Sequence, residues 1–178
     1  MPCRACLLSG QRLSVSNPDR TEGSKGMVQT TELENGIYTA GQISQEDIPD
    51  LAEAGFRTII NNRPDGEEAG QPPYSDTEHA AQAKGINYYY IPLTQETLTP
   101  EKVARFREAM EEAPRPVLVH CRSGARSTLL WALSEARYNK RSTQDLIDVA
   151  GRQGKDISSA SPLIDHYRAW EDSDVKDG

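Results

Sequence analysis

Residues 117–128 read Val-Leu-Val-His-Cys-Arg-Ser-Gly-Ala-Arg-Ser-Thr. The apolar run at Val117–Val119 is typical of a buried strand, and the segment Leu129–Leu133 that follows is helix-forming. A strand that ends abruptly and leads into a helix leaves unpaired backbone N–H groups around one point. Together with the helix dipole, these groups favour a bound anion. The stretch therefore predicts an anion site in the turn formed by Arg122, Ser123, Gly124, Ala125 and Arg126.

Cys121 opens this turn and Arg126 closes it. A helix N-terminus and nearby arginines favour the thiolate form of a cysteine, so we expect Cys121 to attack the central atom of a bound oxyanion. The planar guanidinium of Arg126 matches two oxygens of such an anion. Ser127 has two candidate roles, as a helix cap and as a hydrogen-bond donor to the leaving thiolate. The alternative is a buried, inert cysteine, but such a residue rarely lies beside two arginines at a corner of this kind.

The segment His120–Ser127 resembles the active-site loop of cysteine-dependent phosphatases of the tyrosine and dual-specificity class. Those enzymes place five residues between the cysteine and the arginine, whereas this chain places four, Arg122 to Ala125. The shorter loop and its Cys-Arg-Ser-Gly order resemble rhodanese-type sulfur transferases instead. The upstream Gly-His-Ile and Asp-Val-Arg motifs of rhodaneses are absent, so the resemblance favours the phosphatase fold.

Three more segments, Asn35–Gly41, Phe56–Asp65 and Tyr90–Leu93, resemble the bacterial phosphatase-like family of the beta-lactamase hydrolase-like proteins. The resemblance runs from about Thr31 to about Arg137. It implies an α/β fold of the tyrosine/dual-specificity phosphatase type, with a central, mostly parallel sheet of about four to five strands flanked by helices. It also implies a hydrolase of phosphate monoesters that forms a phosphocysteine. The alternative is a sulfur transferase that carries a persulfide on the same cysteine. Neither reaction needs a metal or an organic cofactor.

The resemblance also implies a general acid, which this class usually carries as an Asp after the strand matching Tyr88–Leu93. Here that loop contains no Asp, which leaves Glu96 as a candidate. Asp65 is the other, because Arg-Pro-Asp resembles the acid loop of tyrosine phosphatases, although Asp-Gly is equally typical of a turn. We favour Asp65 over Glu96. We expect Arg63 to be either an extra anion contact or a solvated charge, and Glu67–Glu68 to form a solvated face.

Composition limits the possible partners. The net charge of −7 and a pI near 5.0 argue against nucleic acid, and no apolar run approaches the ~20 residues of a membrane helix. We expect a small anionic substrate or a phosphorylated molecule, and no membrane partner. The three cysteines are few and odd in number, so they do not form a disulfide framework. This suggests a cytoplasmic protein. We take the pair Cys3 and Cys6 as incidental and expect no metal site.

Periodicity separates a tail from a domain. Residues 1–29 carry no periodic apolar pattern and are expected to be a disordered tail, with Met27 as a candidate start of translation. Residues 30–174 are expected to form a single phosphatase-like domain. Strands are predicted at Gly36–Ala40, Phe56–Asn61, Ile86–Leu93 and Val117–His120.

Helices are predicted between and after these strands. Their expected starts are a cap at Ser44, a Ser75–Glu78 capping box, caps at Thr99 and Ser142, and the Ser161–Pro162 pair. This alternation predicts an α/β sandwich whose ligand binds at the carboxyl ends of the strands.

Overall fold

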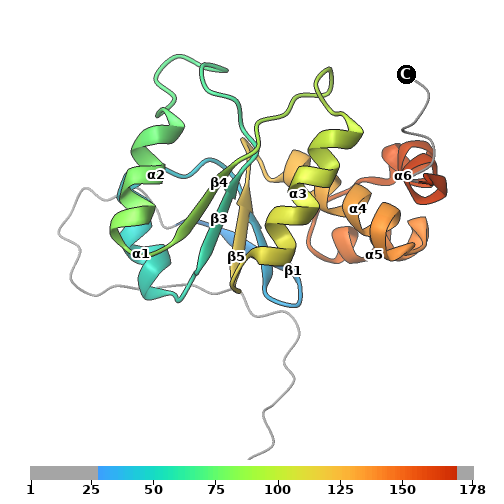
Figure 1. Ribbon diagram of the computed structural model, residues 1–178, viewed down its shortest axis with the longest axis horizontal. Helices are drawn as coiled ribbons and strands as arrows, with labels where there is room; N and C mark the ends of the chain where they lie inside the picture. The colour runs from blue at the N-terminus through green and yellow to red at the C-terminus, as the bar shows by residue number, and fades with distance from the viewer. Residues whose placement is uncertain (1–27, 172–178) are drawn as a thin grey trace, which may run out of the picture.

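The computed structural model describes residues 28–171, in which five strands form one sheet between two groups of helices (Figure 1). The spatial order is β1-β2-β5-β3-β4. The strands are β1 Thr30–Glu34, β2 Ile37–Ala40, β3 Thr58–Asn61, β4 Asn87–Tyr90 and β5 Val117–His120. The last four are parallel to one another, because helical crossovers return the chain to the same end of the sheet each time. The predicted, mostly parallel sheet is confirmed.

Helices α1 and α2 cover one face of the sheet, and α3 and α4 cover the other, with α5 and α6 packed beyond α4 (Figure 1). The helices are α1 Ile48–Glu53, α2 Tyr74–Ala83, α3 Pro100–Glu112, α4 Ala125–Asn139, α5 Thr143–Arg152 and α6 Ser161–Ala169. Short 3-10 turns, η1 Gln45–Asp47 and η2 Ser158–Ala160, precede α1 and α6. Alternation along β5 supplies both cores: Leu118 packs toward α1, whereas Val117 and Val119 pack toward α3 and α4.

Strand β1 was not predicted, because its sequence Thr-Thr-Glu-Leu-Glu has little apolar content. It pairs antiparallel with β2 and forms an edge of the sheet. The turn between them places Asn35 and Gly36 at positive φ, 48° and 74°. Asn-Gly with this geometry is a strong hairpin signal, so the sequence did contain the information for β1.

The helix starts agree with the predictions in part. The Thr99 and Ser142 side chains accept hydrogen bonds from Lys102 N and Asp145 N, which confirms both caps. The Ser75–Glu78 capping box is wrong, because α2 already begins at Tyr74 with Pro73 at its N-cap. The two consecutive prolines restrict the backbone just before Tyr74, so the helix begins one residue ahead of Ser75.

Helices α5 and α6 share the core of the sheet. Leu146 of α5 and Ile164 of α6 are fully buried in the same cluster as Leu130 and Leu133 of α4. Within residues 28–171, none of the helices combines the length and apolar character needed to cross a bilayer. Residues 1–27 include Met27 and nearly all of the predicted tail, and they lie outside the described part of the chain. Residues 172–178 also lie outside it.

Candidate active site

The turn after β5 lies at the carboxyl ends of the parallel strands, where Cys121 follows His120 directly. Helix α4 begins at Ala125 with Gly124 at its N-cap, in the left-handed conformation with φ of 88°. A Cβ on Gly124 would lie 3.4 Å from the carbonyl oxygen of Ala40, which adds crowding to an already unfavourable φ. Glycine at this position is therefore a requirement of the strand-to-helix corner.

Three successive carbonyls of the turn are hydrogen-bonded to groups outside it. The Arg122 carbonyl accepts from Gln42 N at 3.2 Å, that of Ser123 from Lys155 Nζ at 2.7 Å, and that of Gly124 from Thr128 N at 3.0 Å. Each planar trans peptide directs its N–H opposite to its carbonyl. Fixing these carbonyls outward therefore turns the following N–H groups toward the inside of the turn.

Gly41 allows the turn to pack closely on the end of β2. A Cβ at this position would lie only 2.9 Å from the Arg122 carbonyl oxygen, a distance that real Cβ atoms do not reach. Any side chain at Gly41 would push the turn away and disturb the hydrogen bond from Gln42 N to Arg122.

The Cys121 side chain lies inside this turn. Cys121 is 1% exposed, and its Sγ accepts a hydrogen bond from Gly124 N at 3.1 Å. The N–H groups of Ala125, Arg126 and Ser127 precede the first intrahelical bond of α4. The sulfur therefore lies against backbone N–H donors at the positive end of α4.

Arg126 is held by a residue that the sequence interpretation placed in solvent. Its Nη1 and Nη2 donate to the two carboxylate oxygens of Glu67 at 2.7 and 2.9 Å, and Nη1 also donates to the Leu93 carbonyl at 2.9 Å. The Glu67 side chain is only 23% exposed. Glu67 remains on the surface, as expected, but its carboxylate is paired with Arg126 and is not free in solvent.

The ion pair also lowers the pKa of Glu67. The hydrogen bond from Arg126 outweighs partial burial and, with help from Arg63, lowers the pKa of Glu67 from 4.5 to about 2. Because this pKa is depressed, the stabilisation is fully present above pH 4.5 and is lost only as the pH falls toward 2. At neutral pH the carboxylate therefore orients the Arg126 guanidinium.

Arg63 extends this pair into a network. It is 3% exposed and donates from Nε to Glu67 at 2.8 Å, from Nη2 to Glu68 at 3.0 Å and from Nη1 to Gln42 at 2.9 Å. Glu68 also pairs with the exposed Arg122 at 2.5 Å. Of the two expectations for Arg63, the solvated charge is wrong, because the side chain is buried and its guanidinium is paired. Its contacts position the loop after β3 against the cysteine turn.

Ser127 makes a contact that the sequence did not predict. Its hydroxyl donates to Asn62 Oδ1 at 2.9 Å, whereas Asn62 Nδ2 donates to the Ile91 carbonyl at 3.0 Å. Both side chains are fully buried. Ser127 is therefore not the N-cap of α4, which is Gly124, and it joins the helix start to the ends of β3 and β4.

The two candidate acids lie on the two loops that border Arg126. Asp65 is exposed, and its Oδ1 accepts from Tyr74 N at 2.9 Å, while its own N–H donates to Tyr90 Oη at 3.0 Å. Glu96 is exposed in the loop after Leu93, and a hydrogen bond from Thr94 lowers its pKa. A depressed pKa disfavours the protonated form that a general acid needs, which weakens the case for Glu96.

His120 adds no charge to the site. It is 1% exposed, and burial lowers its pKa to about 4, so the imidazole is neutral at pH 7. The positive charge around Cys121 therefore comes from the arginines and the helix end. Among residues 28–171, no three His, Cys, Asp or Glu side chains gather closely enough to hold a metal ion.

Residues 30–138 match the model of one protein family, described as the phosphatase-like domain of the beta-lactamase hydrolase-like protein. A curated beta-lactamase hydrolase-like protein from Agrobacterium fabrum (strain C58) is 34% identical over 142 residues, which are 80% of this chain and 33% of that protein. The chain therefore spans about a third of the length of the curated relatives it matches.

Solved structures agree on the fold. A candidate phosphatase from Neisseria meningitidis Z2491 is 29% identical, with a TM-score of 0.70 over 77% of this chain and 96% of that one. The core catalytic domain of a PP-IP phosphatase from S. cerevisiae is 19% identical, with a TM-score of 0.59 over 78% and 84% of the two chains. The fold is that of the tyrosine and dual-specificity phosphatases, as the sequence predicted.

Proposed function

Because this chain belongs to the phosphatase-like domain family of the beta-lactamase hydrolase-like proteins, we propose that it is a cysteine-dependent phosphatase of phosphate monoesters. Cys121 is the proposed nucleophile. The proposal concerns the domain alone, since the curated relatives are about three times as long as the stretch they share with it.

One observation carries the proposal: Cys121 Sγ accepts from the turn itself, while Arg126 keeps a pair of donors unused by described residues. A guanidinium has five N–H donors. Glu67 and Leu93 use three of them, on Nη1 and Nη2, which leaves Nε–H and one Nη2–H on the same edge. That edge is a fork suited to two oxygens of a phosphoryl group.

In the proposed reaction, the Cys121 thiolate attacks phosphorus in line and the bond to the ester oxygen breaks. Arg126 and the N–H groups of Arg122, Ser123, Gly124 and Ala125 stabilise the charge on the non-bridging oxygens. The leaving oxygen takes a proton from the acid, for which we propose Asp65. Water then attacks the phosphocysteine, the Asp65 carboxylate accepts its proton, and inorganic phosphate and the thiolate are released. Ser127 acts through Asn62 as a positioning residue at the helix start.

The test compares two activities in one preparation of the full chain. We expect steady hydrolysis of p-nitrophenyl phosphate and a phosphocysteine on Cys121 after rapid acid quenching, seen by mass spectrometry. We expect slower sulfur transfer from thiosulfate to cyanide. A persulfide on Cys121 with sulfur transfer faster than hydrolysis of any phosphate would replace the phosphatase proposal by the sulfur transferase.

Asp65→Asn tests the general acid. The amide keeps an oxygen to accept from Tyr74 N, so the loop should be preserved while the transferable proton is lost. We expect kcat for phenyl phosphate to fall by about 10²–10⁴-fold, because a poor leaving group needs protonation. The fall should be smaller for p-nitrophenyl phosphate, whose leaving group is more acidic.

Glu96→Gln is the matched control for this variant and should have little effect on either substrate. If Asp65→Asn hydrolyses phenyl phosphate as fast as the unmodified protein, Asp65 is a turn residue and not the acid.

A further inference from the structure

The carbonyl of Ser123 and the N–H of Gly124 belong to one peptide unit, and each side of that unit contacts a different group. Lys155 Nζ donates to the carbonyl oxygen at 2.7 Å, and the N–H donates to Cys121 Sγ at 3.1 Å. Because a trans peptide is planar, its C=O and N–H point in opposite directions. The ammonium, the peptide and the sulfur therefore form one continuous series of hydrogen bonds.

The backbone on both sides of Lys155 is fixed. Lys155 follows α5, and its N–H donates to the Ala150 carbonyl at 3.0 Å, while Gly154 ends the helix at a φ of 75°. This arrangement is the Schellman ending, which gives the backbone a defined direction after the helix. Two residues after Lys155, Ile157 is 6% exposed and packs in the main core. Only the side chain of Lys155 has to be ordered for its ammonium to contact Ser123.

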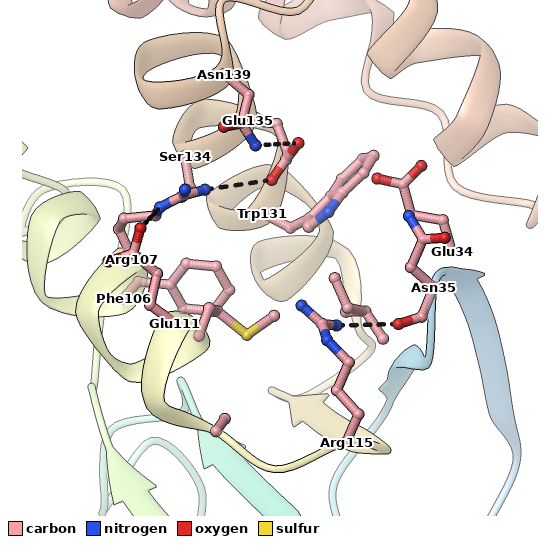
Figure 2. Close-up of a pocket in the computed structure, with 13 residues that line it drawn as sticks. Glu34, Asn35, Phe106, Arg107, Glu111, Arg115, Trp131, Ser134, Glu135 and Asn139 are labelled. Atoms are coloured by element: carbon pink, nitrogen blue, oxygen red, sulfur yellow. Dashed lines mark hydrogen bonds and ion pairs between the residues drawn. The ribbon is translucent and has the colours of Figure 1, made fainter.

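The charge of Lys155 is not neutralised by a carboxylate within residues 28–171. Near the other end of α4 the usual arrangement is found: Figure 2 shows Arg107 paired with Glu111 and Glu135, at 2.7 and 3.8 Å. Lys155 is partly buried and instead contacts a carbonyl oxygen. A hydrogen bond from a charged donor is stronger than a neutral one, and hydrogen bonds in series polarise one another. The ammonium therefore acts on the peptide that contacts the sulfur.

The residues of this peptide do not fix its orientation by themselves. Gly124 lies at a φ of 88°, and glycine permits rotations of the adjoining peptide that other residues resist. As the N-cap of α4, it also lacks a side chain that could hold the turn. A rotated peptide would point the Ser123 carbonyl at Cys121 Sγ and the Gly124 N–H at the ammonium. Both contacts would then be repulsive, so the ammonium favours the observed orientation.

We propose that Lys155 is a positioning residue of the cysteine turn. Its ammonium holds the Ser123–Gly124 peptide in the orientation that presents the Gly124 N–H to Cys121 Sγ and keeps the carbonyl out of the turn. Its contribution to turnover rests on the function proposed above, whereas the orientation of the peptide does not. Lys155 lies outside residues 30–138, which match the family model, so the contact comes from the C-terminal part of this chain.

Lys155→Met tests this role, because methionine is of similar length and carries no charge. The orientation is followed through the Gly124 amide by ¹⁵N–¹H NMR of the full chain, labelled with ¹³C at serine carbonyls and ¹⁵N at glycines by cell-free synthesis. Only Gly10 and Gly124 follow a serine, so the ¹³C-edited spectrum contains these two signals, and Ser9→Ala identifies the first. We expect Lys155→Met to move the Gly124 signal and to speed its exchange with solvent about tenfold or more, because a lost hydrogen bond removes protection.

Turnover provides the second measurement. In Lys155→Met, kcat for p-nitrophenyl phosphate should fall about tenfold, the value of one hydrogen bond to a charged group. Lys155→Arg keeps a charged donor and should preserve both the Gly124 signal and kcat. Lys140→Met is the matched control and should change neither. Lys140 Nζ also donates to backbone carbonyls, those of Arg168 and Trp170, but it does so at the other end of α4.

The two proposals fail separately. A Gly124 signal that Lys155→Met does not move overturns the positioning role, whether or not the protein hydrolyses phosphate esters. So does an unchanged kcat in Lys155→Met, or a loss that Lys155→Arg or Lys140→Met reproduces in full. A moved Gly124 signal in a protein that hydrolyses no phosphate ester overturns the phosphatase proposal and supports the role of Lys155 in orienting the peptide.

Discussion

Cys121→Ser should reduce hydrolysis of p-nitrophenyl phosphate to the rate of buffer alone, a loss on the order of 10⁴–10⁶-fold. A serine hydroxyl is a poor nucleophile unless a neighbouring base activates it. His120 precedes Cys121 in the chain, but its imidazole is buried, and the proposed mechanism assigns it no proton transfer. The loss therefore falls on the chemical step.

Binding of anions should survive this substitution. Serine is close to cysteine in size, and its oxygen can still accept from Gly124 N, so the turn and Arg126 remain in place. Titration calorimetry with inorganic phosphate should give an affinity within about threefold of the unmodified protein. Appreciable turnover by Cys121→Ser would rule out Cys121 as the nucleophile.

Arg126→Lys should lower kcat by about 10²–10³-fold, the usual cost of removing a donor to the oxyanion. Lysine keeps the charge but has no planar fork. It cannot span both oxygens of Glu67, reach the Leu93 carbonyl and also present two parallel donors to a phosphoryl group. Steady-state kinetics with p-nitrophenyl phosphate should show the loss mainly in kcat.

Glu67→Gln provides the companion to that variant. It leaves Arg126 unchanged and removes the carboxylate that orients it, so we expect a smaller loss than for Arg126→Lys. Substitution of Arg126 and Glu67 together should cost less than the sum of the single losses, because each acts through the other. Near-normal kcat in Arg126→Lys would show that Arg126 does not clamp the oxyanion, and Arg122 would be the next candidate.

The sequence predicted the parts of the site that one continuous segment forms. An apolar strand, a turn with Cys121 and Gly124, and a helix are local patterns, and the parallel sheet follows from their alternation with other helices. The family resemblance, expected over about Thr31 to Arg137, is confirmed by a match over residues 30–138.

The partners of that segment were not predicted, because they come from distant loops. Glu67 is 59 residues from Arg126 along the chain, and Asn62 is 65 residues from Ser127. Both lie in a polar stretch that looks like an ordinary solvated loop, and periodicity carries no information about such contacts. Arg63 is a signal that the sequence did offer: an arginine two residues after a buried strand has to be paired if the fold buries it.

The boundary of the family match falls at residue 138, one residue before α4 ends at Asn139. Residues beyond it still belong to the same hydrophobic core, through Leu146 and Ile164, and the Lys155 Nζ donates to the Ser123 carbonyl of the cysteine turn. We propose that the folding unit extends through α6. An expression fragment trimmed to the homologous segment would expose the inner surface of α4 to solvent and release one of the outward carbonyls, so fragments for crystallisation or fusion should end beyond Ala169.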